Sequence, residues 1–111
     1  MPPIGNLGNS PVPLESLSSV KAATTFAEFE APCDGKATVG INLSTTSALT
    51  LYGTPSGGAA LNMGLLNGGS DLTAGNFLTQ DFPINKGNKY GFQVATAQTG
   101  AVVISVTARL D

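Results

Sequence analysis

The chain has 111 residues, of which five are Lys or Arg, seven are Asp or Glu and none is His, so its formal net charge at pH 7 is −2. Charged residues make up 11% of the chain, against about 25% in an average soluble domain, while 41% of the residues are hydrophobic. This composition predicts one folded domain with a real core. It argues against nucleic-acid binding, which needs a basic patch, and against catalysis or metal binding by His.

The sequence gives no signal for a cofactor, a metal ion or a membrane. A membrane-spanning helix would need about 18 consecutive apolar residues, and the chain has no such run. Its first residues also lack the basic start and apolar stretch of a secretory signal. Cys33 is the single cysteine, so an internal disulfide and a Cys-rich zinc site are excluded. We expect a free, inert thiol, as suits a reducing cytoplasm.

Residues 1–23 differ in composition from the rest of the chain, because they hold four of the seven prolines among Gly, Asn and Ser. Proline fixes φ and lacks a backbone donor, so this stretch predicts an extended N-terminal arm, with one short helical turn possible over 14–20. A disordered tail is the plainer interpretation. Regularly spaced aliphatic residues favour an arm that docks on a partner. The candidate partner-binding residues are Ile4, Leu7, Val12, Leu14, Leu17 and Val20.

From Thr24 to the end, 24–111, apolar and polar residues alternate with the period of a β-strand. Strands are predicted over 26–31, 37–43, 49–52, 61–65, 82–84, 90–94 and 101–110. Gly, Pro, Asn and Asp mark turns between them, at 32–35, 53–58, 67–70, 86–89 and 99–100. The segment 72–78 is ambiguous because Ala-Gly-Asn interrupts it. About eight strands with frequent turns predict an all-β fold, an antiparallel β-sandwich or jelly roll.

The acidic residues are the remaining candidates for chemistry. Glu28 and Glu30 share one strand face, and a pair of facing carboxylates is what a glycosidase needs. A solvated strand face, or an ion pair with another subunit, is the simpler interpretation. Asp34, Asp71 and Asp81 are expected at turns, where Asp caps backbone groups; a calcium site there lacks a spaced acidic motif. Without His no serine triad can form, so we expect a protein that is not an enzyme.

Most of the seven aromatic residues lie in alternating stretches and are predicted to pack in the core. The chain has no Trp, so a sugar-binding platform has no positive signal, although it stays possible. A surface with few charges lowers the solubility of a free monomer. Such a surface suits a protein that is covered by other subunits.

Two stretches carry a resemblance to known proteins: Phe29–Lys36, which leads into the alternating strand to Leu43, and the hairpin Lys86–Val94. Through these two stretches the chain resembles small trimeric jelly-roll modules, such as the heads of phage fibres and tumour-necrosis-factor or complement-like sandwiches. Its Pro-rich arm and low charge make it similar to the capsid decoration (cement) proteins of tailed phages.

The resemblance to decoration proteins implies a structural virion protein that binds the capsid lattice and stabilises the shell. It implies a homotrimer whose arm contacts the major capsid protein, located on the capsid surface and assembled in the host cytoplasm. The alternative is a receptor- or glycan-binding head domain of a phage fibre or tail.

Overall fold

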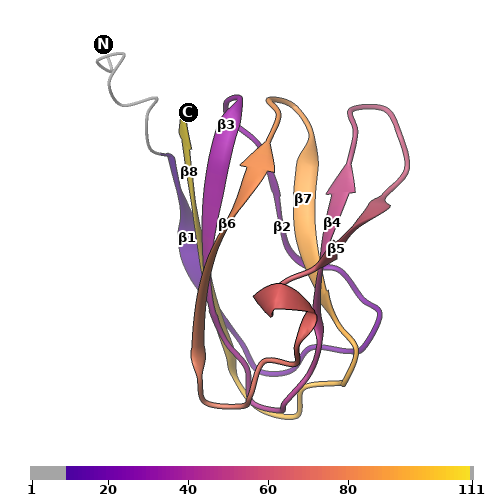
Figure 1. Cartoon of the computed structure of the whole chain (residues 1–111), viewed down its shortest axis with the longest axis vertical. Coiled ribbons are helices and arrows are strands. Elements are labelled where there is room, and N and C mark those ends of the chain that lie inside the picture. The colour runs from indigo at the N-terminus through magenta and orange to yellow at the C-terminus, as the bar shows by residue number, and fades with distance from the viewer. Residues whose placement is uncertain (1–9, 111) are drawn as a thin grey trace.

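A computed structural model describes residues 10–110, which fold into two facing four-stranded antiparallel sheets (Figure 1). The strands are β1 (Ser10–Leu17), β2 (Phe26–Glu30), β3 (Gly35–Asn42), β4 (Leu49–Thr54), β5 (Leu61–Leu65), β6 (Phe77–Ile84), β7 (Lys89–Val94) and β8 (Val102–Leu110). One sheet has the order β1-β8-β3-β6 and the other the order β2-β7-β4-β5. A short 3-10 helix, η2 (Asn67–Gly69), lies between β5 and β6. No helix of residues 10–110 could cross a membrane.

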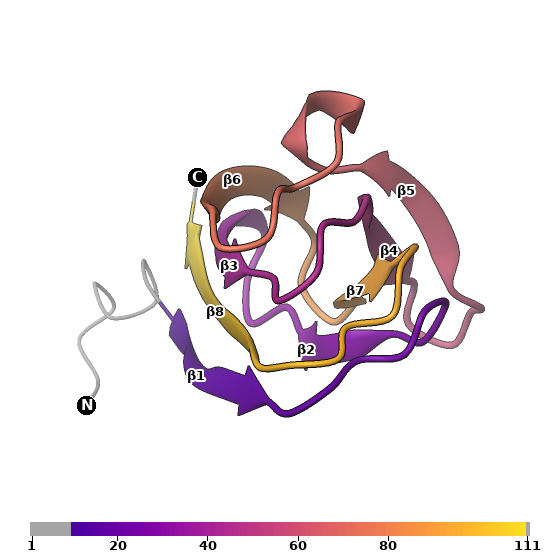
Figure 2. The same cartoon turned by 90° about the horizontal axis from the view of Figure 1, so that it is seen from below.

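The strands pair in a nested way, which is what makes the sandwich a jelly roll. β1 pairs with β8, β2 with β7, β3 with β6 and β4 with β5, as if one long hairpin had been rolled up. Seen from below, the roll appears as two walls around the core, with η2 standing outside on the side of β5 and β6 (Figure 2). The predicted all-β antiparallel sandwich is therefore confirmed.

The first strand corrects the predicted arm. Residues 10–17 form β1 and pair with β8 along their length, apart from a register shift between Val12 and Glu15. Of residues 14–20, where the sequence allowed one helical turn, 14–17 belong to this strand. The proline-rich composition misled the prediction because proline is compatible with a strand at the edge of a sheet, where one side needs no hydrogen bonds. Residues 1–9 lie outside the described residues, and the arm stays a prediction for them.

The structure also shows which part of segment 72–78, ambiguous in the sequence, belongs to a strand. Only its end belongs to a strand, since β6 begins at Phe77, and Leu72 makes an isolated bridge to Ser47. The other predicted strands from residue 26 onward are confirmed, with ends that shift by a few residues.

The core lies between the sheets and consists of the side chains that point inward at alternate positions of the strands. Aromatic rings join the two layers: Phe82 of β6 lies 6.0 Å from both Tyr90 and Phe92 of β7, between ring centres. Phe26 and Phe29 are both buried although they are three residues apart, because Ala27 adopts a positive φ of 53° at a register shift of β2. Burial of most of the aromatic residues is thus confirmed.

Two buried polar residues tie the loops at the end of the sandwich opposite the β4–β5 loop. The Ser47 hydroxyl accepts hydrogen bonds from the backbone N–H groups of Ala95 and Thr96, at 3.0 and 2.9 Å. The Gln98 side chain accepts a bond of 2.8 Å from the Thr45 N–H and donates one of 2.9 Å to the Thr96 carbonyl. Both side chains are almost fully buried, so their polar atoms need these partners within the protein.

Candidate functional site: the free edge of β5

A sandwich has four edge strands, and in the described part of this chain they are β1, β6, β2 and β5. Edge strands expose unpaired backbone groups, and proteins usually protect them with charge, proline or bulges. Proline or acidic residues are present in three of them, at Pro11, Pro13 and Glu15 in β1, Asp81 and Pro83 in β6, and Glu28 and Glu30 in β2. The sequence of β5, Leu-Asn-Met-Gly-Leu, contains neither, so its protection is limited to a register shift against β4. β1 and β2 have such a shift in addition to their proline or acidic residues. Within residues 10–110, β5 is therefore the edge with the least protection.

β5 also carries large apolar side chains that face solvent. Leu61, Met63 and Leu65 are 59%, 45% and 50% exposed, and no residue of the strand is buried. Opposed residues of antiparallel strands point to the same face. Leu65, opposite Thr50, therefore lies on the outer face, whereas Leu61, opposite the buried Gly53, lies on the inner one. We call this exposed strand side, from Leu61 to Leu65, the β5 edge; it offers apolar contacts on both faces.

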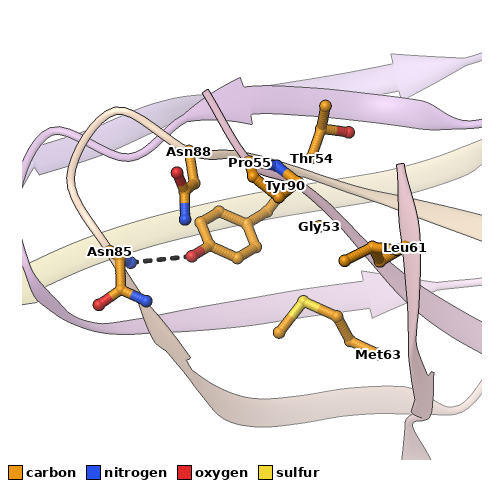
Figure 3. Close-up of a pocket in the computed structure, with 8 residues that line it drawn as sticks. All are labelled: Gly53, Thr54, Pro55, Leu61, Met63, Asn85, Asn88 and Tyr90. Carbon is orange, nitrogen blue, oxygen red and sulfur yellow. Dashed lines mark hydrogen bonds between the residues drawn. The ribbon is translucent and has the colours of Figure 1, made fainter. Parts of the chain in front are cut away.

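A pocket of about 180 Å³ opens beside the β5 edge, at the end of the sandwich where the β4–β5 and β6–β7 loops meet (Figure 3). Its wall is formed by residues of β5, the end of β4, the β4–β5 loop, the β6–β7 loop and β7: Gly53, Thr54, Pro55, Leu61, Met63, Asn85, Asn88 and Tyr90. Met63 lies across Gly53, because a Cβ placed on that glycine would come within 2.5 Å of the Met63 Sδ. Gly53 thus makes room for the side chain that closes the pocket.

The polar groups of the pocket are few and neutral. The Tyr90 hydroxyl accepts a hydrogen bond of 2.8 Å from the Asn85 backbone N–H, which holds the ring against the wall (Figure 3). The Asn88 side chain is bound to the Ser56 N–H at 3.2 Å. Pockets for drug-sized ligands usually measure about 300–1,000 Å³. This smaller space suits one apolar side chain or a single small ring.

The outer face of the β1-β8-β3-β6 sheet carries a polar network. Arg109 of β8 forms an ion pair of 2.7 Å with Asp81 of β6, and the Thr38 hydroxyl between them donates a bond of 2.6 Å to the same carboxylate. Asp81 was expected at a turn and instead lies within β6, because that strand begins earlier than its alternation indicates. The hydrogen bonds from Thr38 and then Arg109 lower the pKa of Asp81.

We expect the Thr38→Val variant to raise the midpoint at which Asp81 titrates, because the variant removes the largest cause of the lowered pKa. A carboxyl whose pKa is lowered by folding contributes stability above its ordinary pKa and loses it as the pH falls through the lowered value. Carbon-13 NMR of the Asp81 carboxyl across an acid titration measures the midpoint. Identical midpoints in the two proteins would contradict the assigned role of the Thr38 hydroxyl.

The structure separates the six arm residues that the sequence proposed for partner binding. Val20 is buried in the chain's own core, and Leu17 packs against that core. Val12 and Leu14 lie in β1. Ile4 and Leu7 lie outside the described residues. Partner binding by the side chains of Val20 and Leu17 would therefore compete with their packing in the sandwich.

The other candidates keep the plainer interpretation. Glu28 and Glu30 are exposed on β2, Asp34 caps the Lys86 backbone N–H at 2.7 Å, and Cys33 is free and buried. Among residues 10–110, no group of three or more metal-binding side chains occurs. Sequence reasoning missed the β5 edge, although the uncharged Leu-Asn-Met-Gly-Leu run was a usable signal.

No family model, no curated protein and no solved structure matches this chain.

Proposed function

We propose that this protein is a structural virion protein, a capsid decoration or cement protein that binds the capsid lattice and stabilises the shell. The observation that carries the proposal is the β5 edge, which is uncharged, free of proline and lined by Leu61, Met63 and Leu65. An exposed edge of this kind promotes aggregation of a free monomer, whereas in an assembly another chain covers it.

The low charge of the chain supports the same role. A lattice binder needs many weak apolar and backbone contacts, which repetition over the shell strengthens, and it needs no reactive side chain. The capsid as partner rests on the resemblance of the sequence to decoration proteins. On this proposal the protein is a homo-oligomer, with a trimer expected from the resemblance, and it is not an enzyme. Residues 1–9, with Ile4 and Leu7, remain candidates for contact with the major capsid protein.

The proposal predicts that the chain is present on the capsid of virus particles made by the genome that encodes it. Quantitative mass spectrometry of purified particles measures its copy number, and immunogold labelling shows its position. Leu65→Lys should lower the copy number at least about tenfold, because it places a charge on the apolar edge. The control Ala97→Lys adds the same charge on an exposed loop and should leave the copy number unchanged.

Two further measurements complete the test. Shells that carry the wild-type protein should resist heat better than shells without it, and removal of residues 1–9 should lower occupancy while β1 stays intact. A longer truncation to Val20 would remove β1 and a core residue, and would unfold the sandwich rather than probe the arm. Absence of the chain from purified particles would overturn the proposal.

A receptor- or glycan-binding head is the second candidate, and the pocket beside the β5 edge favours it. Its neutral side-chain amides at Asn85 and Asn88 are groups that hydrogen-bond to sugar hydroxyls. A glycan array with saturable binding that Asn85→Ala abolishes would support this function. Particle labelling confined to the capsid surface would count against it.

A further inference from the structure

We propose that the partner of the β5 edge is a second copy of the same chain. β5 of one subunit would pair with β5 of the other across a two-fold axis. The inference rests on the proposed function, since it takes the β5 edge as an assembly surface, and it names the occupant of that surface. Antiparallel pairing would join the two β2-β7-β4-β5 sheets into one continuous eight-stranded sheet.

Charge is the first argument for a second copy. In an antiparallel two-fold contact residue i of one copy faces residue j of the other and j faces i, so each strand meets a copy of itself and like charges come within a short strand's length of one another. Glu28 and Glu30 are exposed on the edge strand β2 and would bring four carboxylates together in such a contact. The edge strands β1 and β6 contain proline, which lacks the backbone donor that strand pairing uses. β5 contains neither an acidic residue nor a proline. Among the described edges it is thus the one on which self-pairing meets neither obstacle.

The placement of the apolar side chains is the second argument. Leu65 lies on the outer face of the edge, and Leu61 and Met63 lie on the pocket side. A second β5 would bring the same set, so apolar groups would cover one another on both faces of the joined sheet. Methionine adapts its shape to irregular gaps, and the pocket beside Met63 offers space for a side chain of the added strand.

The symmetry of this contact limits the assembly that it can form. A patch that pairs with itself closes after two copies, whereas a ring of three needs two different patches. The β5 contact alone therefore gives a dimer. Together with a separate three-fold contact whose axis crosses it at a right angle, it would give six copies. A trimer held by a three-fold contact alone would leave each β5 edge without a second β5 strand to pair with.

Sedimentation equilibrium of the purified full chain tests the pairing. We expect a mass of two chains, or an even multiple of the 11.2 kDa chain. Met63→Lys should raise the dissociation constant at least about tenfold, because each copy would bring a positive charge into the apolar contact. The control Ala97→Lys should leave it unchanged, and circular dichroism should show the same β-sheet content in all three proteins.

Cysteine cross-linking locates the contact. The native Cys33 is buried, so a new cysteine on β5 would be the accessible thiol. Single cysteines placed in turn along 61–65 should give a disulfide-linked dimer on a non-reducing gel at the position nearest the axis. Thr79→Cys, on the edge strand of the other sheet, should stay monomeric on the same gel.

The outcomes separate this inference from the proposed function. A monomeric or trimeric mass, or equal cross-linking at Thr79 and along β5, would overturn the self-pairing. If such a protein still decorated particles, the proposed function would stand with a different partner for the β5 edge. A β5-linked dimer that is absent from particles would support the pairing and overturn the virion role.

Discussion

Replacement of Phe92 with Ala should lower the free energy of unfolding by about 4 kcal/mol, the range typical of a buried Phe that is cut to a methyl group. Phe92 is fully buried on β7, and its ring centre lies 6.2 Å from Phe26 and 6.0 Å from Phe82. Phe82 belongs to the other sheet, so the lost ring would leave a cavity between the layers. Urea unfolding followed by circular dichroism measures the change.

Phe77→Ala is the matched control for this substitution. The same atoms are removed, but the Phe77 side chain is 65% exposed at the start of β6, so little burial is lost. We expect a change of less than about 1 kcal/mol. Equal losses in the two variants would show that the aromatic cluster does not hold the sheets together.

The strands of the domain were predictable because each is built by a local rule. Alternation over 37–43 and 101–110 reports one buried face, and the structure buries that face at Val39, Ile41, Ile104 and Val106. Turn residues between the strands mark where the chain reverses. These signals are contained in a few consecutive residues, so no knowledge of the partner strand is needed.

β1 was not predictable by the same rule. Pro11 and Pro13 argue against a strand in the interior of a sheet, yet they are acceptable at its edge. Whether a segment lies at an edge depends on pairing with β8, which begins some 85 residues later in the chain. The nested order of a jelly roll places its first strand beside its last. A local reading therefore took the strand for an arm.

The exposure of the β5 edge, which carries the proposed function, could not be predicted from local sequence either. Alternation over 61–65 resembles that of the half-buried strands and predicts one face in the core. In the structure every residue of β5 is exposed, because the strand is the last of its sheet and Gly64 adopts a positive φ of 108° beside a register shift. What distinguishes β5 is its position, and position follows from strand order, which periodicity does not report.

The burial of the polar residues Ser47 and Gln98 was the third feature that the sequence did not predict. Ser47 lies in the polar run Ser44–Ser47, and Gln98 lies in a loop; nothing in either stretch marks one residue as buried. Their importance comes from backbone groups of distant loops that need partners. Such a role can be tested by changing the hydrogen-bonding character of one atom.

The Gln98→Glu variant should lose about 3 kcal/mol of unfolding free energy at pH 7, because an ionised carboxylate would be buried without its former donor. Gln98 is 2% exposed, and its Nε2 donates to the Thr96 carbonyl at 2.9 Å. A carboxylate oxygen cannot donate and would repel that carbonyl. Urea unfolding at pH 7 measures the loss against the wild-type protein.

Acid should restore part of the stability that Gln98→Glu loses. Burial and the facing carbonyl raise the pKa of the introduced carboxyl in the folded protein, because the neutral acid can donate to Thr96. A group with a raised folded pKa contributes stability that is fully present below its unfolded pKa, near about 4.3 for Glu, and lost as the pH rises through the folded value. The difference from wild type should therefore shrink as the pH falls toward 4.

Gln93→Glu is the matched control, because its partner can reverse its role. The Gln93 Nε2 donates to the Thr25 hydroxyl at 3.0 Å, and a hydroxyl can donate to a carboxylate in its turn. We expect a loss of less than about 1 kcal/mol, with little dependence on pH. If both variants lost the same amount at pH 7 and neither recovered in acid, the bond from Gln98 to the Thr96 carbonyl would not be what ties these loops together.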